Sequence, residues 1–132
     1  MNAPRLSQSA YGAANRALGT PRSIEGAVLT QVTGQLRAAT APDAPFPALV
    51  SAVDANRRLW TTLIADLGSS DNALPEALRA QLISLGIFVL RHGEKVVRRE
   101  AEAGPILEIN AAVIRGLRGD PVGDPVVAVA TS

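Results

Sequence analysis

Apolar residues recur along this chain at the three- and four-residue spacing that is typical of amphipathic helices. Thr20-Pro21 offers a capping hydroxyl followed by a proline at the first helical position, so a helix is expected over residues 20–39. A second helix is expected over 47–67, after a proline-rich break. A third should begin at Pro75 and continue over 75–103, and Gly-Pro should then end it and start a last helix over 104–117.

These segments predict an all-α fold, a small bundle of about four helices joined by short loops. A weaker pattern over 9–18 predicts a possible short N-terminal helix, and residues 1–8 are expected to fray. We expect one helical domain over residues 1–118 and a flexible Pro/Gly-rich tail over 119–132.

The third helix is unusual because it carries two apolar stripes when it is plotted at 100° per residue. The first stripe consists of Leu78, Leu82, Leu85, Val89 and Val96, and the second consists of Ile83, Ile87 and Leu90, with Val97 between the two. A surface helix of a small domain buries one face only. The second stripe therefore indicates either a central place in the bundle or a groove for a partner's helix.

Composition narrows the possible functions. The formal net charge is +1, which gives no basis for a nucleic-acid or membrane-surface footprint. The chain has no cysteine, which removes disulfides, thiol catalysis and cysteine–zinc sites. No segment approaches a membrane span, and the N-terminal residues lack the apolar core of a secretory signal, so we expect a cytoplasmic protein. No catalytic pattern is recognisable; we expect no enzyme, no cofactor and no metal site.

Five side chains are considered as candidates for recognition. Trp60 with the neighbouring Arg57 could anchor an interface, although a core tryptophan is the favoured interpretation because apolar residues share its face. Asn56 and Asn110 lie within apolar stripes, which favours buried amides bonded within the fold over amides left open to a partner. The single histidine, His92, lacks further ligands and is expected to be packed or half-exposed.

Taken in order, several segments of the chain resemble the FlaF family of flagellar biosynthesis regulators from alphaproteobacteria. The resemblance covers roughly Tyr11 to Leu117 and is carried by Thr20-Pro21-Arg22-Ser23-Ile24-Glu25, Asn56-Arg57-Arg58-Leu59-Trp60, the run from Asn72 to Leu85, Arg91-His92, Glu108-Ile109-Asn110 and Gly116-Leu117. It implies a cytoplasmic chaperone that binds flagellin before export and is needed for flagellin production and filament assembly. It also implies a functional link to FlbT, a regulator of flagellin messenger translation.

The two stripes suggest how such binding would occur. We expect Ile83, Ile87 and Leu90 to line a groove for an amphipathic helix, with Trp60 or Arg57 at its edge. Another helix of the same chain could instead cover this stripe. The alternative function is an RNA-binding regulator of flagellin expression, which the near-neutral charge disfavours. The stoichiometry and oligomeric state do not follow from the sequence.

Overall fold

Helices begin and end close to the proline- and glycine-rich breaks of the chain. The computed structural model describes residues 22–117, and within them it has four helices and no strand: α2 (Arg22–Ala39), α3 (Phe46–Leu67), α4 (Glu76–Val97) and α5 (Gly104–Leu117). The predicted all-α bundle is therefore confirmed. The expectations for residues 1–8, 9–18 and 119–132 lie outside the described residues.

The start and end of α3 follow from local chemistry. Pro45 precedes the helix in an extended conformation, with φ −70° and ψ 148°, and Pro47 occupies the first turn, where its missing N–H costs no hydrogen bond. Gly68 ends the helix, and its backbone N–H donates to the carbonyl of Ile64 at 3.0 Å. The predicted range of 47–67 is thus correct to within one residue.

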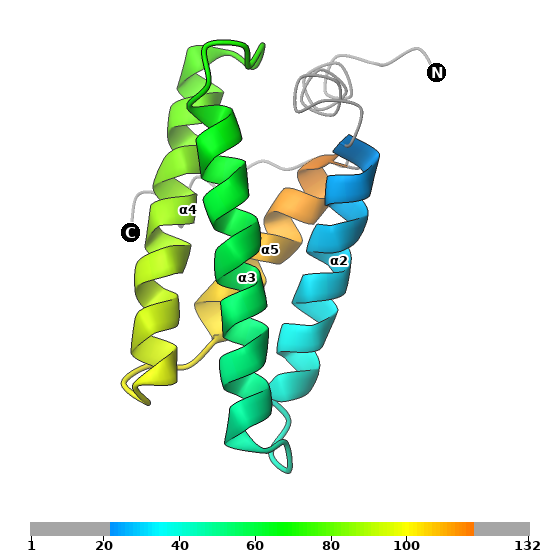
Figure 1. Cartoon of the computed structure of the whole chain (residues 1–132), viewed down its shortest axis with the longest axis vertical. Coiled ribbons are helices and arrows are strands. Elements are labelled where there is room, and N and C mark those ends of the chain that lie inside the picture. Colours follow the sequence, from blue (N-terminus) through cyan, green and yellow to red (C-terminus); the bar gives the residue numbers. More distant parts are fainter. Residues whose placement is uncertain (1–21, 118–132) are drawn as a thin grey trace.

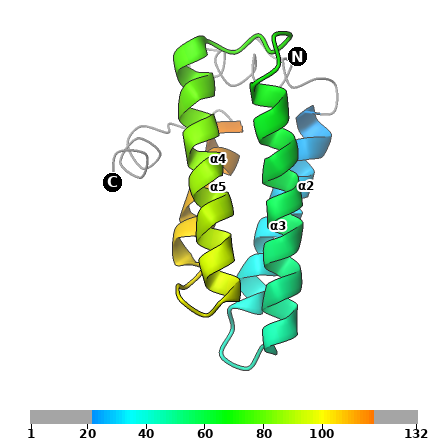
Figure 2. The same ribbon diagram turned by 60° about the vertical axis from the view of Figure 1, so that its left-hand side comes forward.

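The four helices form two layers (Figures 1 and 2). Each helix runs antiparallel to the next one in the chain, and in Figure 2 α3 and α4 form the front pair with α2 and α5 behind them. Helix α3 packs against both α2 and α4, whereas α5 packs mainly on α2 and contacts α4 less. The front of the α3–α4 pair is consequently left without a covering helix among the described residues.

Helix α4 ends earlier than predicted, at Val97 rather than near Ala103. Arg99 adopts the left-handed conformation, with φ 63°, and donates its backbone N–H to Val96 at 3.0 Å, while Glu100 donates to Lys95 at 2.8 Å. This pair of bonds is the Schellman arrangement, which usually has glycine at the left-handed position. The prediction was wrong because the sequence has arginine there and offered no stop signal before Gly104.

The core combines aliphatic residues from all four helices around one tryptophan. The first stripe of α4 belongs to it, with Leu85, Val89 and Val96 buried and Leu78 and Leu82 half-buried. The buried members of the main cluster are Leu36, Ala52, Val53, Trp60, Leu63, Leu85, Val89, Val96, Ala103, Ile106, Ile109 and Ala112. No helix between residues 22 and 117 combines the length and the apolar character that a bilayer crossing requires.

Candidate partner-binding surface

Two glycines of α4 set the distance between α3 and α4. A Cβ atom added at Gly86 would lie 2.8 Å from the side chain of Ile64 and 2.9 Å from Cε3 of Trp60. At Gly93 it would lie 3.2 Å from Cγ1 of Val53. These residues are seven apart, so they lie on the same side of α4, two turns from each other. Both are buried, and they let the two helices approach more closely than larger residues would allow.

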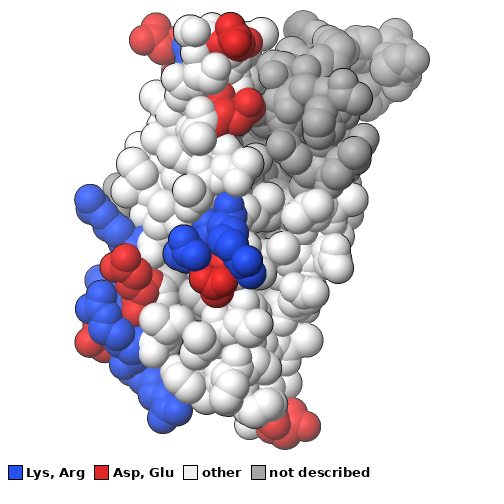
Figure 3. Space-filling view, viewed as in Figure 1, with Lys and Arg blue, Asp and Glu red and all other residues white. Residues whose placement is uncertain are grey.

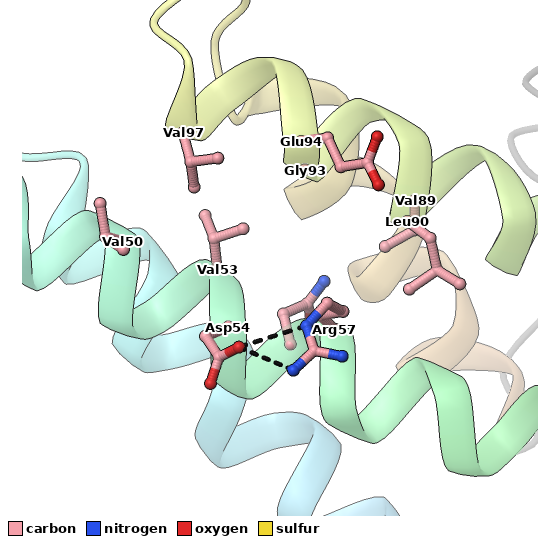
Figure 4. Close-up of a pocket in the computed structure, with 10 residues that line it drawn as sticks. Val50, Val53, Asp54, Arg57, Val89, Leu90, Gly93, Glu94 and Val97 are labelled. Atoms are coloured by element: carbon pink, nitrogen blue, oxygen red, sulfur yellow. Dashed lines mark hydrogen bonds and ion pairs between the residues drawn. The ribbon is translucent and has the colours of Figure 1, made fainter.

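Where α3 and α4 meet at the surface, they leave an apolar hollow of about 220 Å³ (Figure 4). It is smaller than the roughly 300–1,000 Å³ of small-molecule pockets, so it fits one or two side chains better than a metabolite. Figure 4 shows valine and leucine side chains from both helices around it, with charged groups at its border. We call it the α3/α4 hollow; its lining is Val50, Val53, Asp54, Asn56, Arg57, Val89, Leu90, Gly93, Glu94 and Val97.

The second apolar stripe of α4 is divided between partial burial and exposure. Ile83 is half-buried against the small cluster formed by Leu67 and Leu74. Leu90 is half-buried against the main core and lines the α3/α4 hollow. Ile87, between them, is 41% exposed. Other parts of the chain therefore cover this stripe only in part, and the structure brings Leu90, but not Ile83, together with Arg57 at the hollow.

Trp60 occupies the core. Its side chain is 1% exposed, and its indole nitrogen donates to Oδ1 of Asn110 at 2.9 Å. A side chain that is enclosed in this way offers no surface to a partner while the bundle is closed. Trp60 therefore does not lie at the edge of a groove, as the interface hypothesis requires, and the favoured interpretation of a core tryptophan describes it correctly.

Asn56 and Asn110 are buried amides that join three helices. Asn110 of α5 donates its side-chain nitrogen to Oδ1 of Asn56 at 2.8 Å and to the hydroxyl of Thr33 at 3.0 Å. Together with Trp60 these side chains form a buried polar network linking α2, α3 and α5. The expected bonding within the fold is thus confirmed. Thr33 and the tryptophan bond were not foreseen, because partners from different helices do not share a sequence pattern.

The charged border of the hollow is centred on one carboxylate. Arg57 donates to Oδ1 of Asp54 through Nη2 at 2.9 Å and through Nε at 3.2 Å, and Nε of Arg58 lies 3.2 Å from the other oxygen. The hydrogen bond from Arg57 holds the pKa of Asp54 below its ordinary value, and the charges of both arginines add to this effect. Figure 3 shows charged side chains gathered at the middle of this face and along the lower part of α4, with wide uncharged areas between them.

The opposite side of α4 carries a different apolar group. Phe88 is 40% exposed and stacks on His92, with ring centroids 5.3 Å apart. Nε2 of His92 lies 2.6 Å from the carbonyl oxygen of Glu102, in the segment that leads to α5. His92 is half-exposed, as predicted. Within residues 22–117 no group of three His, Cys, Asp or Glu side chains is placed to hold a metal ion.

Sequence reasoning missed the contribution of α3 to this surface. Val50 is 37% exposed at the hollow, and its spacing along α3 does not distinguish it from a core residue. The seven-residue spacing of Gly86 and Gly93 was the available signal, because small residues in line on one helix mark close approach to a neighbour.

The family model described as "Flagellar protein FlaF" matches residues 7–117, which is most of the 132-residue chain. The chain belongs to the FlaF family. The resemblance that was inferred from several sequence segments taken in order is thereby confirmed. This FlaF family member is a flagellum-related protein. No curated protein and no solved structure matches the chain.

Proposed function

We propose that this FlaF family protein is a flagellin-binding chaperone and regulator that acts in the cytoplasm before flagellin export and supports filament assembly. Membership of a flagellar family supports flagellin as the partner. The observation that supports the mode of action is the aliphatic surface along the front of the α3–α4 pair, where Val50 is 37% exposed and Ile87 is 41% exposed beside an apolar hollow. In this proposal the protein acts by binding and not by catalysis. The proposal includes the functional link to FlbT.

An amphipathic helix is the ligand that suits this surface. Antiparallel helices leave a shallow channel between them, and a docked helix places apolar side chains into it at positions i, i+3 or i+4, and i+7. Val50 from α3 and Leu90 from α4 line the hollow from its two sides, and Ile87, three residues before Leu90 on α4, adds an exposed aliphatic side chain. A protein partner is favoured over RNA because the two arginines nearest the hollow already contact a carboxylate.

The test compares Ile87→Asp with Phe88→Asp. The two native side chains are adjacent and nearly equally exposed, at 41% and 40%, but they point about 100° apart around α4. We expect Ile87→Asp to lose flagellin in co-purification and to weaken its affinity by at least tenfold, because a charge replaces an aliphatic contact at the centre of the interface. Phe88→Asp should bind as the wild type does.

Circular dichroism of both variants shows whether each is folded. Undiminished flagellin binding by a folded Ile87→Asp protein contradicts the assigned surface. Failure of the wild-type protein to bind purified flagellin contradicts the proposed function itself.

A further inference from the structure

The surface at the front of α3 and α4 is aliphatic but has no covering helix among residues 22–117. Val50 and Ile87 are 37% and 41% exposed, and the α3/α4 hollow next to Val50 has a volume of about 220 Å³. Valine and leucine make up half of the residues that line it, and its charged groups lie at the border. Aliphatic groups that gather at a surface usually mark a contact with another apolar segment. The hollow therefore suits one or two uncharged aliphatic side chains.

The chain itself carries an uncharged aliphatic run outside the four helices. The run, residues 126–130, reads Val126-Val127-Ala128-Val129-Ala130, and it lies beyond residues 7–117 that the family model matches. In an extended segment, side chains two positions apart lie on the same side, about 7 Å from each other. Val127 and Val129 would therefore present a pair of small aliphatic side chains, which matches the size and the chemistry of the α3/α4 hollow.

The linker between α5 and the aliphatic run is long enough to reach the front of the bundle. Helix α5 ends at Leu117, next to the start of α2, since a Cβ atom added at Gly26 would lie 3.9 Å from the Leu117 side chain. In Figure 2 α5 lies behind α4, so the way to the front passes around a helix that is about 10–12 Å across. Residues 118–126 span up to about 30 Å when they are extended. Asp120 and Asp124 each precede a proline, which favours extended conformations in this linker.

The way around α4 passes two basic side chains. At 100° per residue, Arg91 and Lys95 lie on the side of α4 that faces away from α3, opposite the glycines that contact α3. Both are exposed, and neither forms an ion pair within residues 22–117. The linker carries the acidic residues Asp120 and Asp124. Opposite charges along the way and aliphatic groups at its end therefore favour this segment as the occupant of the hollow.

We propose that the aliphatic run occupies the α3/α4 hollow of the free protein, with Val127 and Val129 in contact with Val50 and Leu90. The run then acts as an internal competitor, which a docking helix must displace before it can use the same aliphatic surface. The displacement rests on the proposed function, in which the docking helix belongs to flagellin. The occupation of the hollow by the run does not depend on that function.

The first experiment uses the whole 132-residue chain without flagellin. The chain has no cysteine, so Thr131→Cys gives a single site for a nitroxide label beside the aliphatic run. We expect the label to weaken the methyl NMR signals of Val50 and Leu90 strongly and that of Val28 in α2 only slightly. Val28 follows Gly26, which lies near the end of α5, so a segment that does not dock would weaken the Val28 signal at least as much.

Substitutions in the run separate docking from mere proximity. Val127→Asp together with Val129→Asp should abolish the selective loss of signal at Val50 and Leu90, because a carboxylate does not enter an apolar hollow without a partner. Val122→Asp in the linker is the matched control and should leave the loss unchanged. With purified flagellin, the double variant should bind about tenfold more tightly than the wild type, as expected when the run occupies the hollow in about nine molecules of ten.

Equal signal losses at Val28 and Val50, or a selective loss that survives in the double variant, overturn the proposal. The same loss in a mixture where nitroxide and isotope are on different molecules assigns the occupant to a second copy of the chain, which also overturns it. If the selective loss is observed but flagellin does not bind, the run occupies the hollow and the proposed function fails. Equally tight flagellin binding by the double variant and the wild type overturns the displacement step alone.

Discussion

Two neighbouring regions that α3 joins reverse the usual distribution of polar and apolar groups. Between α2, α3 and α5, polar side chains are buried, and Asn110 bonds to Trp60, Asn56 and Thr33 within 3.0 Å. At the front of α3 and α4, aliphatic side chains are exposed. The first region fixes how the helices are arranged, because its directional bonds accept only one register. The second region lacks such bonds between helices, and its aliphatic side chains are the ones that the proposed function uses.

Helix α3 connects these regions through Asn56. The oxygen of this amide belongs to the buried network, and the amide itself lines the hollow on the other side. Buried polar bonds and exposed aliphatic groups thus lie on different faces of one helix, and the proposed function assigns recognition to the aliphatic face. Substitutions that separate the two properties therefore test this division.

The largest effect is expected for Asn110→Leu. Leucine removes the acceptor of Trp60 and the donor to Asn56 and Thr33, so several buried polar groups lose their partners at once. We expect a loss of about 3–5 kcal/mol in the free energy of unfolding, measured by urea denaturation. Thr33→Val is the matched control, because it removes one bond of the network and should cost about 1 kcal/mol. Equal losses in both variants would show that Asn110 does not hold the network together.

Gly86→Ala should have the next largest effect. Alanine is the better helix former by about 1 kcal/mol, but its Cβ would lie 2.9 Å from the rigid ring of Trp60. Because overpacking costs about 1–3 kcal/mol, we expect a net loss of up to about 2 kcal/mol in thermal or urea unfolding. Gly34→Ala in α2 is the control, since no atom lies within 4 Å of its added Cβ, and it should stabilise by up to about 1 kcal/mol. A stabilised Gly86→Ala protein would mean that the two helices separate at little cost.

A smaller effect is expected at the end of α4, where the guanidinium carbon of Arg99 lies 3.9 Å from the ring centroid of Phe46. Arg99→Ala and Arg99→Gly both remove this cation–π contact, so their difference isolates the cost of the left-handed backbone. The glycine variant should be more stable than the alanine variant by about 1 kcal/mol in urea denaturation. At Arg98, whose φ is −87°, the same pair should show the opposite order. If the order is not reversed at Arg98, backbone strain does not explain the difference in stability between the two Arg99 variants.

The smallest effect concerns the border of the hollow. The lowered pKa of Asp54 means that its ion pairs stabilise the fold above the unfolded pKa and that this contribution is lost as pH falls through the folded value. Titration of the carboxyl carbon by NMR should place its midpoint below 3.8. Arg57→Gln should raise this midpoint more than Arg58→Gln does, because the hydrogen bond from Arg57 is the main cause. Equal rises in the two variants would contradict that ranking.

Periodicity predicted what depends on residues close in sequence. The helix ranges, the buried stripe of α4 and the burial of the two asparagines follow from spacing within single helices. The early end of α4 could not be predicted, because Arg99 takes a conformation that sequence patterns assign to glycine. Of the residues predicted to bind a partner, Arg57 and Leu90 line the hollow and Ile87 is exposed on α4, whereas Trp60 is buried. The Val50 wall could not be predicted, because it depends on how α3 packs against α4.

The burial of Trp60 gives the protein an internal fluorescent reporter. It is the single tryptophan of the chain, so its emission comes from one known position in the core, in contact range of Gly86 and bonded to Asn110. Docking at the front of α3 and α4 leaves this environment dry, whereas separation of the helices admits water and shifts the emission to longer wavelength. A steady emission maximum during complex formation with a partner that lacks tryptophan would therefore identify binding to a closed bundle, without any label being added.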